Sequence, residues 1–128
     1  GLREGYYVKS DALIVMFDLT SLVTFKNASK LISSYVSFMG NDKPIVLCGT
    51  KCDIKTRKVT NTMIRDFSIK HNIPYVEISS KSNYHFEKPL VRLMKDLTGK
   101  EDLTLFVDEE KPVVIPTLPT DEGWCNLF

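Results

Sequence analysis

Mainly apolar runs of strand length alternate along this chain with longer segments whose apolar residues recur every three or four positions. The runs are Ala12–Phe17, Ile45–Cys48 and Tyr75–Ile78. A run of this kind without strict alternation is typical of a strand covered on both faces, as in a parallel sheet. We therefore predict an α/β fold in which three parallel strands alternate with three helices through right-handed crossovers.

The first two predicted helices have recognisable ends. Thr20 or Ser21 can cap the first helix, which ends near Gly40. Thr60 is the predicted N-cap of the second helix, which ends around Asn72. Their apolar faces are predicted from residue spacing: Ala28, Ile32, Tyr35 and Met39 in the first, and Met63, Ile64 and Phe67 in the second.

The third predicted helix has the most regular apolar spacing in the chain. Pro89 lies near its start, where a missing N–H has little effect, and Gly99 has the position of a C′ cap. Its apolar residues are Phe86, Leu90, Leu93, Met94 and Leu97. After Gly99, prolines and acidic residues predict an extended tail over residues 100–128 rather than a second domain.

Length and charge limit the class of protein. The 128 residues suffice for one modest domain, and a formal net charge of +1 predicts no strong attraction to nucleic acid. No apolar stretch is long enough to span a bilayer, and the start lacks a signal-peptide pattern. The three cysteines have no disulfide-rich spacing, which fits a reducing compartment. Neither Cys48 nor Cys52 has the further ligands that a zinc site needs.

Candidate binding residues follow the second and third strands. Lys51 and Asp53 stand directly after a strand, where open α/β sheets bind ligands. The Asp53 carboxylate can accept two parallel hydrogen bonds, which the N1–H and 2-amino groups of guanine supply and adenine cannot. The stem of Lys51 can lie along the base, and the turn Ser79–Lys81 offers backbone N–H groups to the base oxygen. The alternative is a pair of solvated loops, but two motifs in this order favour nucleotide binding.

Six stretches of the chain resemble Ras-superfamily small GTPases, and within that superfamily they are most similar to the Ran family of GTP-binding nuclear proteins. They are Gly1–Tyr7, Ile14–Ser21, Val23–Asn27, Pro44–Gly49, Asp53–Val59 and Ser82–Pro89. The last stretch resembles Ran rather than Rab, Rho or Ras. The resemblance implies that residues 1–99 form the C-terminal portion of a P-loop small-GTPase domain, followed by the tail of residues 100–128.

The resemblance also implies which residues bind the guanine base of GTP or GDP. These are Thr50, Lys51 and Asp53 in the guanine-specificity motif, and Ser79, Ser80 and Lys81 in the Ser-Ala-Lys element. Most of the family has Asn in place of Thr50, whereas Rho-type members have Thr. Ser80 takes the Ala position, where a backbone N–H makes the contact, so a serine is equally suitable.

The phosphate-binding and catalytic parts of such a protein are not among these residues. The sequence contains no GxxxxGK[ST] loop, and in the family Gly1 corresponds to the middle of switch II. We therefore assign no catalytic residue, and we expect Mg²⁺ only together with an upstream segment. The family places its first strand beside Ala12–Phe17, which would otherwise be an exposed apolar edge. A fragment of this size also buries little surface. We thus expect the chain to be part of a longer protein or a degenerate member of the family, rather than a functional half-domain.

The expected partners are karyopherins and other Ran regulators, in the nucleus and the cytoplasm. In Ran a run of four basic residues contacts transport factors, whereas this chain has Ser68–His71 there, which weakens that expectation. Lys55, Arg57 and Lys58 keep a basic loop that is typical of Ran-like proteins, with a simple solvated loop as the alternative. His71 and His85 are read as structural.

The end of the chain suggests a different class of GTPase. Cys125–Phe128 fits the C-a-a-X pattern, in which a terminal Phe favours geranylgeranylation of Cys125. The neighbouring Asp121 and Glu122 provide no basic second membrane signal, and membrane attachment is expected only if Cys125 is prenylated. Three hypotheses follow: a Ran-like GTPase switch in nucleocytoplasmic transport, a non-catalytic Ran-derived interaction module, and a prenylated Ras-like or Rab-like signalling GTPase.

Overall fold

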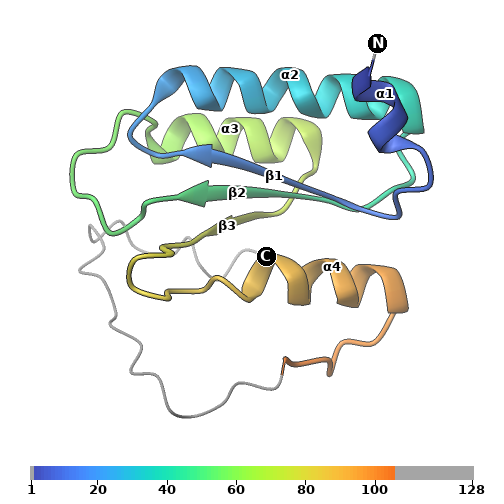
Figure 1. Cartoon of the computed structure of the whole chain (residues 1–128). Coiled ribbons are helices and arrows are strands. Elements are labelled where there is room, and N and C mark those ends of the chain that lie inside the picture. Colours follow the sequence, from blue (N-terminus) through green and yellow to red (C-terminus); the bar gives the residue numbers. More distant parts are fainter. Residues whose placement is uncertain (1, 106–128) are drawn as a thin grey trace.

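The computed structural model of the chain describes residues 2–105, with side chains from residue 5 onward, as three strands and four helices (Figure 1). In chain order they are α1 (Leu2–Tyr7), β1 (Leu13–Asp18), α2 (Leu22–Met39), β2 (Ile45–Thr50), α3 (Asn61–His71), β3 (Tyr75–Glu77) and α4 (Lys88–Thr98). The three predicted strands and three predicted helices are confirmed, and α1 is an addition to them. Tyr7 at the end of α1 packs edge-on against Tyr35 of α2, with ring centroids 5.2 Å apart. Such tertiary packing can hold a helix that is too short to be stable alone.

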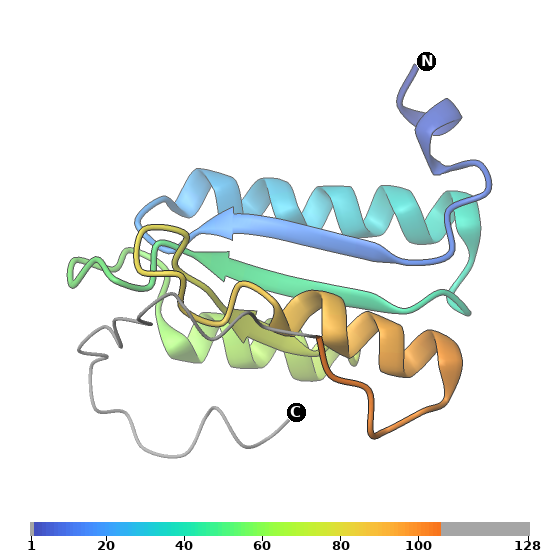
Figure 2. The ribbon, with the colours of Figure 1, turned by 60° about the horizontal axis from the view of Figure 1, so that its bottom comes forward.

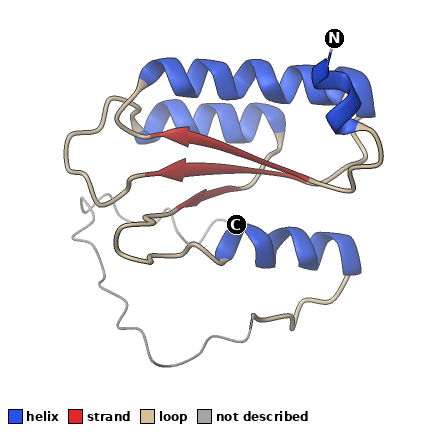
Figure 3. Cartoon of the chain, viewed as in Figure 1, coloured by secondary structure: helices blue, strands red, loops and turns tan. Residues whose placement is uncertain are grey.

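The strands form one parallel sheet in the order β1-β2-β3. Leu13 is in register with Ile45 at one end of the first pair, and Asp18 is in register with Thr50 at the other. Helices α2 and α3 cover one face of the sheet and α4 the opposite face (Figure 2, Figure 3). Because all strands run in the same direction, their carboxyl ends meet at one edge, and the loops that carry the predicted binding residues leave from that edge.

The main core lies between the sheet and the helices α2 and α3. Phe17 of β1 packs against Phe25 of α2 with ring centroids 5.0 Å apart, and Phe25 packs against Phe67 of α3 at 5.6 Å. Leu47 of the central strand is fully buried in the same cluster. Burial of these side chains is the principal force that holds both helices on the sheet.

The structure confirms both predicted helix starts, and one of them has a side-chain capping bond. The Thr60 hydroxyl accepts a hydrogen bond from the Met63 N–H at 3.3 Å, as predicted for the start of α3. The prediction that Thr20 or Ser21 caps α2 is confirmed in position, since Ser21 is the N-cap residue, but no side-chain capping bond accompanies it. Ser21 stands at the N-cap without a side-chain bond, and the Thr20 hydroxyl instead donates to the Asp18 carboxylate at 2.6 Å. The charged carboxylate two residues earlier in the chain makes this a strong, short hydrogen bond that fixes the Thr20 side chain outside the helix.

Helix α4 buries less of its apolar face than its spacing suggests. Pro89 and Leu93 are buried, while Leu90 is exposed by 49%, Met94 by 37% and Leu97 by 50%. The prediction that Phe86 belongs to this helix is wrong: Phe86 precedes the N-cap residue Glu87 and is 54% exposed. On the same side of the sheet, Met16 of β1 is 55% exposed although its register partner Cys48 is fully buried. In the described part of the chain β1 is therefore an apolar edge strand, as the sequence predicts. No helix among residues 2–105 is long and apolar enough to cross a membrane.

Candidate functional site

The two predicted binding motifs meet at the carboxyl edge of the sheet. The Ser79 hydroxyl donates a hydrogen bond of 2.6 Å to Oδ1 of Asp53, although the two residues are 26 positions apart. Ser79 is fully buried and Asp53 is partly buried, so the carboxylate is held from the protein side. The same Ser79 oxygen accepts the N–H of Ser82 at 3.3 Å, which orients the hydroxyl toward Asp53. Ser79 therefore fixes the orientation of the Asp53 carboxylate.

Backbone hydrogen bonds explain why these loops approach each other. The Cys52 N–H donates to the Ile78 carbonyl at 3.2 Å, which joins the loop after β2 to the end of β3. Beyond β3, Ser79 and the buried Tyr84 exchange both backbone hydrogen bonds, at 3.0 and 2.9 Å. This bridge closes a short loop that has Ser80 and Lys81 exposed at its tip. No hydrogen bond between described residues uses the N–H groups of Ser80 and Lys81, so both amides can serve a ligand oxygen.

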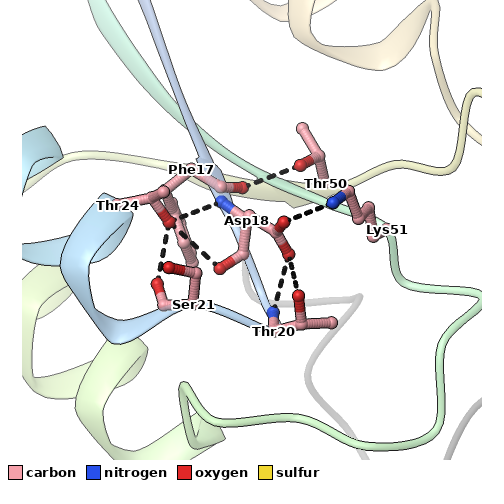
Figure 4. Close-up of polar contacts among 7 residues, drawn as sticks. All are labelled: Phe17, Asp18, Thr20, Ser21, Thr24, Thr50 and Lys51. Carbon is pink, nitrogen blue, oxygen red and sulfur yellow. Dashed lines mark hydrogen bonds and ion pairs between the residues drawn. The ribbon is translucent and has the colours of Figure 1, made fainter.

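Lys51 is held by an acidic residue at the end of β1. Its ammonium group forms an ion pair of 2.6 Å with Oδ2 of Asp18 (Figure 4). Asp18 also accepts the Thr20 N–H at 2.8 Å and the Thr20 hydroxyl at 2.6 Å through Oδ1. The hydrogen bond from Lys51, followed by that from Thr20, lowers the pKa of Asp18 to about 2. The backbone of Lys51 is left-handed, with a φ of 62°. Such a conformation in a non-glycine residue is uncommon and clusters at ligand sites.

Thr50 lies beside the site and supports it from β2. Its hydroxyl donates to the Phe17 carbonyl at 3.0 Å, so the side chain links the ends of β1 and β2 (Figure 4). Its own carbonyl accepts the Leu19 N–H at 3.2 Å. These bonds hold the end of β2 beside the end of β1, and so place Lys51 next to Asp18. The proton of the Thr50 hydroxyl is engaged in the bond to Phe17.

Asp18 and Thr20 are site residues that the sequence analysis does not predict. A signal for them exists, because Asp18 and Thr20 follow the first apolar run directly, as Lys51 and Asp53 follow the second. In a parallel sheet both pairs must lie at the same edge. The ion pair itself depends on the register of β1 with β2, which the sequence pattern alone does not specify.

The predicted basic loop is only partly solvent-facing. Arg57 turns inward, and its two terminal nitrogens donate to the two carboxylate oxygens of Glu77 at 2.8 and 2.7 Å. Its side chain is only 11% exposed, whereas Lys55 and Lys58 are exposed. The expectation of three basic side chains on this loop therefore holds for the two lysines, and the charge of Arg57 is neutralised inside the protein.

The segment Ser68–His71 at the end of α3 is also mixed in exposure. Ser68 is buried, and its hydroxyl donates to the Ile73 carbonyl. Ile69 is 68% exposed, and Lys70 and His71 are exposed at the end of α3. This surface thus presents one apolar side chain, one lysine and one histidine.

The described part of the chain holds two buried cysteines and no cluster of metal ligands. Among residues 2–105 no group of three or more His, Cys, Asp or Glu side chains is arranged to hold a metal ion. Cys48 and Cys52 are buried, and burial raises the pKa of their thiols to about 12 and about 11. Buried protonated thiols are unreactive. Cys125, the predicted prenylation site, lies outside the described residues.

Comparison with protein-family models finds one match that covers most of the described chain. The model for the Ras family matches residues 1–99. The matched segment includes all four helices, all three strands and every residue of the site described above.

Proposed function

The chain belongs to the Ras family, whose members bind guanine nucleotides, and on that premise we propose that residues 50–81 hold the guanine base of GDP or GTP in a nucleotide-driven switch of the Ran type. The observation that carries the proposal is the hydrogen bond of 2.6 Å between Ser79 and Asp53. It joins the two motifs whose separate chemistries suit the same base.

Each group has a distinct part in this proposal. Asp53 accepts the N1–H and the 2-amino group of guanine, which excludes adenine because adenine lacks both donors. Ser79 fixes the Asp53 carboxylate, and the amides of Ser80 and Lys81 donate to the base oxygen. The stem of Lys51 covers one face of the ring while its ammonium group is held by Asp18.

The phosphate groups and Mg²⁺ are assigned to no residue of this chain. In the family a glycine-rich loop, a lysine and Mg²⁺ hold the phosphates and stabilise the charge that develops during transfer. The residues described here bind and orient the base. We assign hydrolysis to none of them.

The Ran-type assignment rests on the resemblance of Asp53–Val59 and Ser82–Pro89 to that family. It implies action in nucleocytoplasmic transport, karyopherins or other Ran regulators as partners, and a nuclear and cytoplasmic location. Because Ser68–His71 replaces a basic run, we propose weaker karyopherin binding than that of Ran. The alternatives are a non-catalytic module that competes for Ran partners and a signalling GTPase prenylated at Cys125.

The first experiment is native mass spectrometry of the purified protein, followed by identification of any nucleotide released on denaturation. We expect GDP or GTP, and competition by added GDP but not by ADP. Equal competition by ADP would overturn the proposed base site. Absence of nucleotide would favour the interaction module. Incorporation of a labelled prenyl donor at Cys125 would favour the third hypothesis.

A further inference from the structure

A forked ion pair joins the loop after β2 to the last residue of β3. Arg57 and Glu77 are 20 positions apart and form two parallel hydrogen bonds of 2.8 and 2.7 Å. Their side chains are 11% and 20% exposed. A forked pair fixes the relative orientation of its partners more strictly than a single contact between point charges.

The two partners stand close in sequence to the two base-binding motifs. Arg57 follows Asp53 by four residues, and Glu77 precedes Ser79 by two. Between them, the Tyr75 hydroxyl donates to Oε1 of Glu77 at 3.0 Å and limits the rotation of the carboxylate. Burial, together with the charge of Glu77, raises the pKa of Tyr75, which keeps this hydroxyl protonated as a donor.

The other side of the same loop is fixed to β1. The N–H groups of Lys58 and Val59 both donate to the carbonyl of Leu19, at 2.9 and 3.1 Å. Val59 and Leu19 are fully buried. The segment from Asp53 to Val59 is thus held at the ends of both outer strands, and the ion pair is its side-chain link to β3.

We propose that Arg57 and Glu77 form a positioning pair that sets the distance between the Asp53 and Ser79 motifs, and thereby determines how strictly the site distinguishes guanine from bases that lack its 2-amino group. The inference rests on the proposed function, since it assigns a purpose to the pair only if the site binds guanine. Neither residue touches the base. Both act through the orientation of Asp53.

Loss of the ion pair should weaken both the affinity for guanine and the discrimination between bases. Without the guanidinium group, Glu77 keeps a poorly solvated charge and draws the surrounding loop toward water. Asp53 and Ser79 then lose their fixed spacing. Because the 2-amino group is recognised only by a correctly oriented carboxylate, base discrimination falls together with affinity.

The test measures dissociation of fluorescent GDP and of fluorescent inosine diphosphate, which lacks the 2-amino group, from the full-length protein. For Arg57→Gln we expect GDP to dissociate about 10- to 100-fold faster, as small misplacements of binding groups produce. The preference for GDP over the inosine analogue should fall about fivefold or more, the equivalent of roughly one hydrogen bond. Arg57→Lys, which keeps the charge and loses the fork, should lie midway.

The matched control is Arg92→Gln, which breaks the exposed pair with Asp96 and should change neither quantity. A folded Arg57→Gln protein with unchanged base preference would reduce the pair to a structural contact and overturn the inference. If Arg57→Gln does not fold, the preference of Arg57→Lys for GDP over the inosine analogue is the test, and an unchanged preference would overturn the inference. Absence of GDP preference over ADP in the unsubstituted protein would instead overturn the proposed function, and the positioning role with it.

Discussion

The hydroxyl of Tyr75 lies so close to Gly49 that the β-carbon of any other residue at position 49 would clash with it. A β-carbon there would overlap the hydroxyl oxygen, and it would lie 3.1 Å from Cζ and 3.2 Å from Cε2 of the ring. Gly49 directly precedes the Thr50–Asp53 motif. The glycine therefore leaves room for the Tyr75 hydroxyl, which reaches Glu77.

Gly49→Ala should destabilise the fold by about 1 to 3 kcal/mol, the usual effect of overpacking a buried contact. The clash is mainly with the hydroxyl, so adding Tyr75→Phe should restore part of the loss. Denaturant unfolding of the single and double variants measures this. Gly5→Ala is the control, because nothing lies within 4 Å of its β-carbon position. No rescue by Tyr75→Phe would show that the ring as a whole is the obstacle.

Asp53→Asn should weaken guanine-nucleotide binding by about 100-fold or more, since the site then presents an amide N–H to two donor groups. Preference should shift toward xanthine, whose 2-oxo group can accept that N–H. Competition of GDP and xanthosine diphosphate for the full-length protein measures the shift. Unchanged affinity for GDP would show that the base binds elsewhere.

Ser79→Ala and Ser80→Ala should differ sharply. Ser79 donates to a carboxylate, and loss of such a bond weakens guanine binding by about tenfold or more. Ser80 is exposed and is proposed to act through its backbone N–H, so its substitution should leave the dissociation rate of GDP unchanged. Equal effects of the two substitutions would contradict the division of roles between the two serines.

Asp18→Asn should lower the free energy of unfolding at neutral pH, and the difference from the unsubstituted protein should disappear in acid. The pKa of Asp18 falls from 3.8 to about 2 in the folded protein. The stabilisation therefore persists above about pH 4 and disappears as the pH drops toward 2. Unfolding free energies of both proteins at pH 7, 4 and 2.5 test this. If the two proteins differ in unfolding free energy by the same amount at all three pH values, the effect comes from altered packing or hydrogen bonding and not from the charge of Asp18.

Strand positions, and the meeting of the Thr50–Asp53 and Ser79–Lys81 motifs at one edge of the sheet, could be predicted because they follow from the pattern of apolar runs. Apolar runs predict adjacent parallel strands, and parallel strands deliver the residues after them to one edge. Thr60 and Gly99 are likewise local signals for helix ends, and the structure has both.

The remaining features depend on tertiary geometry that a pattern does not carry. Arg57 reads as a surface residue until the path of its loop brings Glu77 within reach. The Thr20 hydroxyl donates to the carboxylate of Asp18, which becomes evident only once the loop after β1 is in place. The apolar stripe of α4 correctly indicates a helix, but the extent of its burial depends on what lies beside it.

The order of the strands in the sheet is the same as their order in the chain. Each strand can therefore pair with its predecessor as soon as it leaves the ribosome, because no later segment has to be inserted between them. We expect the sheet to grow from β1 toward β3 during synthesis. The guanine motif of β2 would then be exposed first, and it would gain its Ser79 contact only when residues 75–84 have emerged.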